Sequence, residues 1–228
     1  MIWIALPILA LLILISRLQK QKPKPISGGA PKTGGNEVDL KAMIDEANKI
    51  AGWKTLEEAI NEYGKFLGVY TQGGNIPRTT MTLDEFAHIV TKTVDKKVIA
   101  QSILAIAIRE QGASRGLSFP DNNPFGFNAF KNGWTYIRHL TNGIFLAKDK
   151  NGWRWFIGFP SLENAIKAME LALRRKGFDK IQSPEEFVYL YVRKWWNPTK
   201  DENKLQEIIQ KEMRNLIAVW RQAGRYVG

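Results

Sequence analysis

The sequence predicts an α+β fold that is mainly helical and carries a small β-hairpin region. Helix-opening patterns, a Ser or Thr followed three residues later by Glu, recur along residues 37–228 and predict a helical body. One aromatic-rich segment, Trp134 to Phe159, breaks this pattern and contains two Asn-Gly turn signals. With 228 residues, 44% of them hydrophobic, the chain is long enough to bury a sizeable core.

Six segments are predicted to be helical, because each has a start signal, a stop signal or continuous apolar character. They are Thr55 to about Leu67, Thr82 to roughly Val94, Lys97 to Gln111, Ser161 to Lys176, the segment opened by Ser183-Pro184, and Thr199 to about Gln222. Lys97 to Gln111 is strongly apolar, so we expect this helix to be buried. The aromatic runs WTYIRHL and WRWFIGF are predicted strands, beside turns at Thr141–Gly143 and Lys150–Gly152.

The N-terminus begins with an uncharged apolar run, Ile2 to Ile15, followed by basic residues. With its neighbours this run approaches the length of a membrane span, so residues 1–18 are a predicted transmembrane anchor. A cleaved signal peptide is the alternative, but no Lys or Arg precedes the run and no clear A-x-A follows it. The basic C-terminal flank places the large domain on the cytoplasmic, or equivalent interior, side. Residues 19–36, rich in Lys, Pro and Gly, are a predicted linker, and residues 37–228 a predicted folded domain.

The formal net charge of +11 favours an anionic partner such as nucleic acid, anionic lipid or an acidic wall polymer. Beyond residue 36 the Lys and Arg residues are interleaved with acids, and no nucleic-acid-binding motif is present, so no specific nucleic acid is expected. The chain has no Cys, which excludes disulfides and Cys-based zinc sites. His88 and His139 lack the H-E-x-x-H spacing, so neither a metal nor another cofactor is expected.

Glu110 is the candidate catalytic residue. Ile99, Ile103 and Ile106 are spaced by four and three, and the next step of four reaches Glu110. We expect these apolar neighbours to desolvate the carboxyl and raise its pKa. A carboxylic acid that is protonated near neutral pH is what glycosidic cleavage requires. The alternative is a structural salt bridge from Glu110 to Arg109, Arg115 or another cation.

Four segments in register resemble the glucosaminidase family of peptidoglycan hydrolases, of the flagellar and autolysin type, in the lysozyme-like superfamily. Ile103–Gly112 (ILAIAIREQG) is similar to the family's helix "ILA-A--E-G", and Asn122–Gly126 (NNPFG) to its "NN-FG". Phe159–Ile166 resembles the segment after the family's hairpin, and Asn197–Ile209 its late loop and last helix. The resemblance covers about Ile99 to Glu212. It implies a lysozyme-like helical body with a small β-hairpin lobe and a catalytic core at about 97–222.

The resemblance implies a peptidoglycan-degrading glycosidase of the N-acetylglucosaminidase or muramidase type, with Glu110 as general acid. The loop residues Asn122, Asn123, Phe125 and Gly126 are then expected to bind substrate at the floor of the sugar cleft. The family's second carboxylate normally lies on the hairpin, whose only acid here is Asp149. Asp149 is therefore the candidate second catalytic group, with a turn-forming role as the alternative, and Asp121 is the other candidate.

Aromatic side chains are expected to complete the sugar site. The family tends to place a Tyr before its late loop, where this chain has Trp195-Trp196, with Tyr191 one turn earlier. Trp153, Tyr191 and Trp195 are the expected stacking residues, because aromatic rings can cover the apolar faces of sugars. Packing in the core is the alternative role for each of them.

Three other functions stay open from the sequence. One is a lytic transglycosylase that uses Glu110 alone, and another is a non-enzymatic virion or structural protein with a lysozyme-like fold. The third is a membrane-tethered nucleic-acid-binding protein. A wall enzyme anchored with its domain inward suits the membrane of a phage virion. The expected partners are therefore peptidoglycan glycan strands, the bilayer through residues 2–18, and other virion proteins.

Overall fold

The computed structural model describes residues 40–70, 76–111, 117–149 and 152–228. The chain separates into two units, Met1–Val38 and Asp39–Gly228. The expected anchor at 1–18 and the expected linker at 19–36 lie outside the described residues. Among the described residues, no helix is both long enough and apolar enough to cross a membrane.

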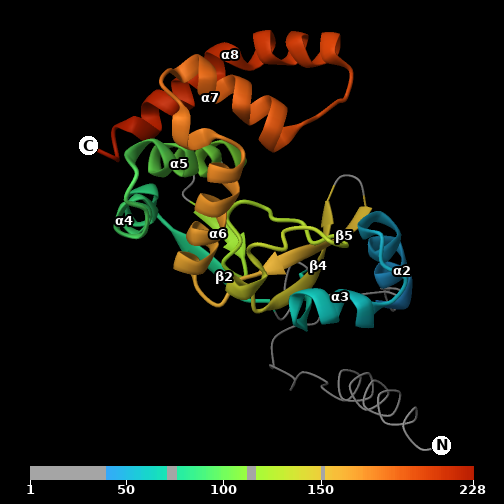
Figure 1. Cartoon of the computed structure of the whole chain (residues 1–228). Coiled ribbons are helices and arrows are strands. Elements are labelled where there is room, and N and C mark those ends of the chain that lie inside the picture. Colours follow the sequence, from blue (N-terminus) through green and yellow to red (C-terminus); the bar gives the residue numbers. More distant parts are fainter. Residues whose placement is uncertain (1–39, 71–75, 112–116, 150–151) are drawn as a thin grey trace, which may run out of the picture. The chain divides into compact units, whose positions relative to one another are not determined.

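Residues 40–228 form an α+β fold, as predicted, in which helices dominate (Figure 1). The described helices are α2 (Leu40–Ala51), α3 (Leu56–Tyr63), α4 (Leu83–Thr93), α5 (Lys97–Gln111), α6 (Leu162–Arg175), α7 (Pro184–Leu190) and α8 (Glu202–Gly224). The described strands are β1 (Lys65–Tyr70), β2 (Arg78–Met81), β3 (Leu117–Pro120), β4 (Gly143–Asp149) and β5 (Gly152–Gly158). Short 3-10 turns occupy Arg138–Leu140 and Phe178–Lys180, and a π-helix occupies Tyr191–Trp196.

Most of the predicted helix starts are confirmed by their caps. Thr82 and Glu85 form a complete capping box on α4, and the side chains of Thr55, Ser161 and Ser183 each accept a bond from a first-turn amide. Helix α8 differs, because its cap is Asp201, which accepts bonds from the amides of the two residues after Glu202.

The predicted extent of the first helix is wrong at its C-terminal end. Helix α3 stops at Tyr63 and not near Leu67. Gly64 has φ 100°, a left-handed value that ends the helix, and Lys65–Tyr70 continue as strand β1.

Two small sheets form, and they correct the predicted hairpin. The first sheet has the order β1-β4-β5, with β1 parallel to β4 and β4 antiparallel to β5; the second pairs β2 with β3 antiparallel. A hairpin of two antiparallel strands is confirmed, since β4 pairs with β5 up to Asp149↔Gly152, while residues 150–151 lie outside the described residues. The predicted strand at Trp134–Leu140 is wrong. Trp134 has φ 49° and residues 138–140 form a 3-10 turn, while strand β4 starts after it, at Gly143.

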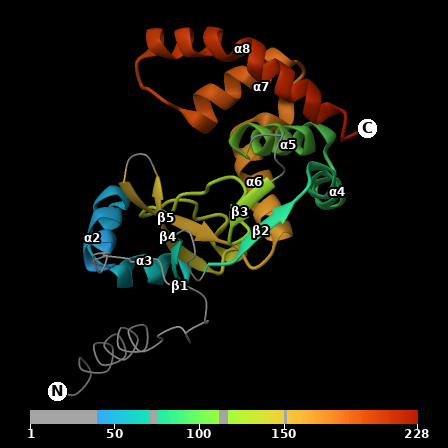
Figure 2. The ribbon, with the colours of Figure 1, turned by 180° about the vertical axis from the view of Figure 1, so that it is seen from behind.

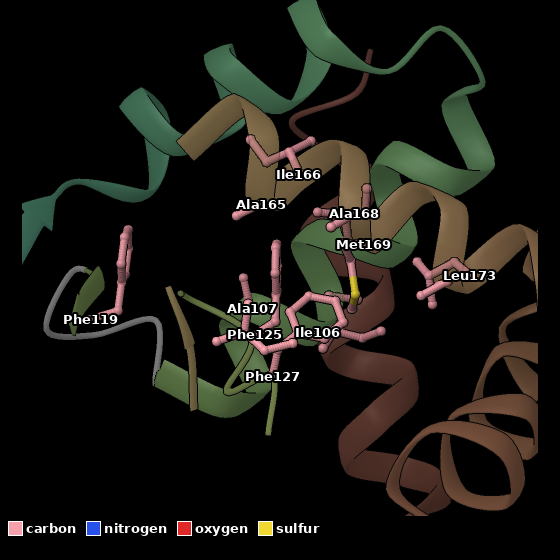
Figure 3. Packing of buried hydrophobic residues seen from close by; sticks show 14 of the residues in the cluster. Ile106, Ala107, Phe119, Phe125, Phe127, Ala165, Ile166, Ala168, Met169 and Leu173 are labelled. Carbon is pink, nitrogen blue, oxygen red and sulfur yellow. The ribbon is translucent and has the colours of Figure 1, made fainter. Parts of the chain in front are cut away.

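Helix α5 lies at the centre of the helical body. It packs against α8, α6 and α4, and α7 packs on α8 (Figures 1 and 2). Every residue of α5 from Ile99 to Ile108 except Gln101 is buried, which confirms the buried helix that its apolar sequence predicts. Figure 3 shows Ile106 and Ala107 of α5 facing Ala165, Met169 and other residues of α6, with aromatic rings from the loop after β3 beside them.

The sheet region is joined to the same core. Helix α2 packs on β5, where the indole Nε1 of buried Trp155 donates to Asn48 Oδ1 at 2.9 Å. Helix α3 packs on β4, and the Tyr63 hydroxyl donates to the backbone oxygen of Gly133 at 2.7 Å. One hydrophobic cluster therefore runs from α2 through the first sheet to α5 and α8.

Candidate functional site at the end of helix α5

Glu110 lies in the last turn of α5, where the helix emerges from the core. Residues up to Ile108 are buried, whereas Arg109 and Glu110 are exposed. The expectation that apolar neighbours desolvate Glu110 is therefore wrong, because only the preceding turns of the helix are covered. The carboxyl is open to solvent at the end of a rigid, buried helix.

One buried side chain holds the Glu110 carboxylate. The hydroxyl of Tyr191 donates to Glu110 Oε1 at 3.0 Å. Tyr191 is only 3% exposed, and its ring stacks on Phe187 with centroids 5.9 Å apart. Burial, and next the neighbouring Glu110 charge, raise the pKa of Tyr191 well above its usual value. The hydroxyl therefore stays protonated and acts as a fixed donor to one oxygen of the carboxylate.

The predicted alternative of a salt bridge between Glu110 and Arg109 does not occur. Arg109 pairs instead with Glu212 of α8, with 3.2 Å between Arg109 Nη2 and Glu212 Oε2. Arg115 lies outside the described residues. Glu212 is a carboxylate that sequence reasoning missed, and its charge also contributes to the raised pKa of Tyr191. Its only signal in the sequence is its position late in the long helix, which does not reveal the neighbour across the fold.

Tyr191 owes its position to the π-helix that continues α7. The segment Tyr191–Trp196 is wound as a π-helix, which ends at Asn197 in the left-handed conformation with φ 43°. A π-helical turn contains more residues than an α-helical turn, and such turns are frequent at functional sites. The predicted Tyr191 thus meets Glu110 although the two are 81 positions apart.

The two asparagines of the NNPFG loop bind the protein's own backbone. Asn123 is 2% exposed; its Nδ2 donates to the backbone oxygens of Phe127 at 3.1 Å and Ile157 at 2.9 Å, and its Oδ1 accepts from the Phe127 amide at 2.9 Å. Asn122 donates to the Phe159 carbonyl at 3.0 Å and accepts from the Thr79 hydroxyl at 3.1 Å. Asn123 is buried and all of these amide atoms are engaged, so the expected contacts of Asn122 and Asn123 with sugar hydroxyls are replaced by a structural role.

The rest of the loop divides between the core and the surface. Phe125 is buried and packs against Phe127, which corrects its expected contact with substrate. Gly126 is exposed with φ 63°, and a Cβ there would meet no atom within 4 Å. Gln111, directly after Glu110, donates from Nε2 to the Pro124 carbonyl at 3.1 Å. The structure thus ties the loop to the end of α5, through a residue that the sequence reasoning overlooked.

Trp195 lies beside the same loop. Its ring contacts Phe127 at a centroid distance of 5.7 Å and Trp134 at 6.2 Å, and it is half-buried. Trp134 has left-handed backbone with φ 49°, which is unusual for a bulky residue, and its Nε1 donates to the Asn128 carbonyl at 2.9 Å. Together Trp134 and Trp195 form a partly exposed aromatic surface next to the loop.

The three other predicted residues have different surroundings. Trp153 is on β5, and its amide donates to Glu46 of α2 at 3.2 Å. Asp149, at the end of β4, forms an ion pair with Arg154 at 3.0 Å. Asp121 is 8% exposed, and burial raises the pKa of its carboxyl above the usual value. The structure therefore brings together Glu110, Tyr191, Trp195 and the NNPFG loop. Asp121 directly precedes this loop, and its backbone oxygen accepts from the Phe159 amide at 3.2 Å. No contact from Trp153 or Asp149 to Glu110 is recorded among the described residues.

Comparison with known proteins finds no match for this chain among protein-family models, curated proteins or solved structures. Within the described ranges, no three His, Cys, Asp or Glu side chains gather as a metal-binding group.

Proposed function

We propose that the chain is a lysozyme-like glycosidase that cleaves the glycan strand of peptidoglycan, with Glu110 as the general acid. The proposal rests on one observation: the Glu110 carboxylate is exposed at the end of a buried helix, beside the NNPFG loop, and accepts a hydrogen bond from the buried Tyr191 hydroxyl. The sequence resemblance of ILAIAIREQG and NNPFG to the glucosaminidase family adds independent support. No other described side chain combines an exposed carboxylate with a bond from a buried tyrosine.

The proposed chemistry follows from the two oxygens of the Glu110 carboxyl. Tyr191 occupies Oε1, so Oε2 is the atom that would carry the proton to the glycosidic oxygen as the bond to the anomeric carbon breaks. Glu110 is exposed, so a bound glycan would have to displace water from this carboxyl. In this proposal the partly exposed rings of Trp195 and Trp134, which contact each other, would stack on a sugar ring bound along the loop.

A lytic transglycosylase is the second candidate, and the surroundings of Asp149 and Asp121 favour it. Asp149 is in an ion pair with Arg154, and Asp121 is buried, so neither is a free carboxylate that could activate water. A single acid suffices when a hydroxyl of the substrate attacks the anomeric carbon, and the product is then an anhydro sugar. Mass spectrometry of the released sugar ends separates the two reactions and identifies which linkage is cut.

The test of the catalytic proposal is the Glu110→Gln variant of the full chain, assayed for clearing of a peptidoglycan suspension. Loss of a general acid lowers the rate roughly 100- to 10,000-fold. Glu57→Gln is the matched control, because Glu57 is an exposed glutamate in the first turn of α3. If Glu110→Gln and Glu57→Gln clear the suspension equally fast, Glu110 is not the acid.

We also propose a membrane setting, on the sequence of the N-terminus alone. The uncharged run Ile2–Ile15 with its basic C-terminal flank supports a single-pass anchor with the domain on the interior side. The membrane of a phage virion would store a wall enzyme in this orientation until entry. An intact N-terminus in purified particles is the expected result, and a mature chain that starts after residue 25 would contradict it.

A further inference from the structure

The outward face of α8 is basic along its whole length. Its opposite face is buried against α5 and α7 through Leu205, Ile209, Leu216, Trp220 and Ala223. At 3.6 residues per turn, the positions turned away from this buried stripe include five cations, all of them exposed. These are Lys204, Lys211, Arg214, Arg221 and the C-cap residue Arg225, here called the α8 basic face.

The charge of this face is not neutralised within the described part of the chain. None of the five cations takes part in an ion pair recorded for the described residues, and Glu207 is the acid that shares their side of the helix. Glu212 points to the other side, where it pairs with Arg109. An ordinary solvated helix face interleaves both signs of charge. Five cations against one acid over roughly 32 Å of helix, at 1.5 Å per residue, are instead typical of a surface that meets an anion.

We propose that the α8 basic face docks on the surface of an anionic lipid bilayer. The face follows a single helix and offers no large apolar side chain, which suits attraction to a flat layer of headgroups rather than insertion. A shallow hollow of about 490 Å³ is lined by Ala218, Arg221, Gln222, Arg225 and Tyr226. The two guanidinium groups at its edge are suitable donors for a headgroup phosphate.

The sequence of the chain favours a bilayer over nucleic acid as the occupant. The N-terminal sequence predicts a second contact with the membrane, which is also positively charged: the apolar run Ile2–Ile15 is followed by Arg17, Lys20, Lys22 and Lys24. Residues 19–36 span at most about 60 Å when fully extended, so an anchored chain could not carry its domain far from the bilayer. Arg109, next to Glu110, pairs with Glu212 on a side of α8 away from the basic face. The docking inference rests on the proposed membrane setting and is independent of the catalytic proposal.

A fluorophore on α8 tests the proposal in the full chain. The sequence has no Cys, so Ala218→Cys on the outward face provides a unique attachment site for an environment-sensitive dye. We expect a spectral shift with vesicles that contain phosphatidylglycerol, none with phosphatidylcholine alone, and a weaker shift as salt is raised. The dye reports contact at α8 whether or not the N-terminal segment also enters the bilayer.

Two variants, each lacking four positive charges, distinguish the effect of the α8 basic face from the effect of net charge. Changing Lys211, Arg214, Arg221 and Arg225 to Gln should raise the lipid concentration needed for the shift at least tenfold, since each basic residue at an anionic surface contributes roughly fivefold. The control changes Lys49, Lys92, Lys167 and Lys200 to Gln, which removes the same charge from exposed positions elsewhere. It should change that concentration less than threefold.

The possible results are distinct. No shift on anionic vesicles, an equal shift on neutral vesicles, or equal loss in both variants would overturn the proposal. A shift with duplex DNA but not with vesicles would assign the face to nucleic acid instead. Unfolding temperatures of the two variants show that each is folded, and unchanged clearing of peptidoglycan by the α8 variant would show that docking and catalysis are separate.

Discussion

Asn123→Ala distinguishes a structural asparagine from one that binds substrate. Asn123 sits in the loop that resembles the family's NN-FG segment, where the sequence predicts contacts with sugar hydroxyls. In the structure its amide makes three hydrogen bonds to the backbone of Phe127 and Ile157 and is almost fully buried. Truncation to Ala would remove all three bonds, and each of the lost partners is a backbone group.

The loss of stability in Asn123→Ala depends on which hydrogen bonds the backbone partners of Asn123 keep. The Phe127 amide loses its recorded acceptor, and a buried unsatisfied donor costs about 1–3 kcal/mol. The Phe127 carbonyl keeps the Ile157 amide at 2.9 Å, so the loss there is smaller, about 0.5–1.5 kcal/mol for the missing bond. With a similar loss at the Ile157 carbonyl, we expect about 3 kcal/mol less stability in total. For a domain of this size, that lowers Tm by roughly 6–12 °C.

Thermal and urea unfolding of the full chain measure the change. Asn128→Ala is the matched control, because the Asn128 amide makes a single bond of 3.3 Å to the carbonyl of Gly126, two residues away; we expect a shift within about 0.5 kcal/mol. The reasoning is refuted if Asn123→Ala is no less stable than Asn128→Ala. A raised KM for peptidoglycan with unchanged stability would return Asn123 to the substrate-binding residues.

Two further predictions concern Asp121, after strand β3, and Gly143, at the start of strand β4. Burial raises the pKa of Asp121, so the stability that its protonated form confers is lost as pH rises through the folded pKa. Asp121→Asn should therefore raise Tm at neutral pH and have no effect below about pH 3.9, the pKa of an unfolded Asp. A lower Tm of the variant at neutral pH would contradict this. Gly143→Ala should destabilise the chain by about 2 kcal/mol or more in urea unfolding, because φ is 152° and a Cβ would overlap the Lys65 carbonyl in strand β1. Gly126→Ala is the control: a Cβ there meets open space, so the loss of stability should be smaller.

The sequence predicts the helical part of the fold well because the relevant signals are local. A Thr or Ser cap and its partner lie three residues apart, so Thr82 with Glu85 and Ser183 with Glu186 can be read from the chain directly. Gly177 ends α6 with φ 86°, as its position predicts. The buried character of α5 follows from its unbroken apolar composition.

The sheets were harder to predict because their partners are remote in the sequence. Strand β1 pairs with β4 from Lys65↔Gly143 to Tyr70↔Ala147, so its strand character depends on a neighbour about 78 positions away. The aromatic run at Trp134 has strand-like composition, but its backbone turns left-handed so that the indole can reach the Asn128 carbonyl.

In the candidate site too, features with local signals could be predicted, and features that depend on remote residues could not. Glu110 could be found from helical spacing, whereas its exposure depends on where the core stops covering α5. Tyr191 was predicted only as a stacking residue, and its hydrogen bond to Glu110 requires the π-helix, which no local signal announces. The three backbone bonds of Asn123 could not be predicted, because the sequence does not distinguish a loop asparagine that contacts a ligand from one that binds the backbone.

The parallel pairing of β1 with β4 has a consequence for any shortened form of this protein. The catalytic core expected from the family resemblance begins near residue 97 and does not include β1. A fragment cut there would expose the backbone amides and carbonyls of β4 along one side, in a strand whose Ile144, Phe145 and Leu146 are fully buried in the whole chain. Such an open, apolar strand edge readily recruits a second copy, so the fragment would self-associate. Strand β1 thus covers an edge of β4 that would otherwise be open to a second copy.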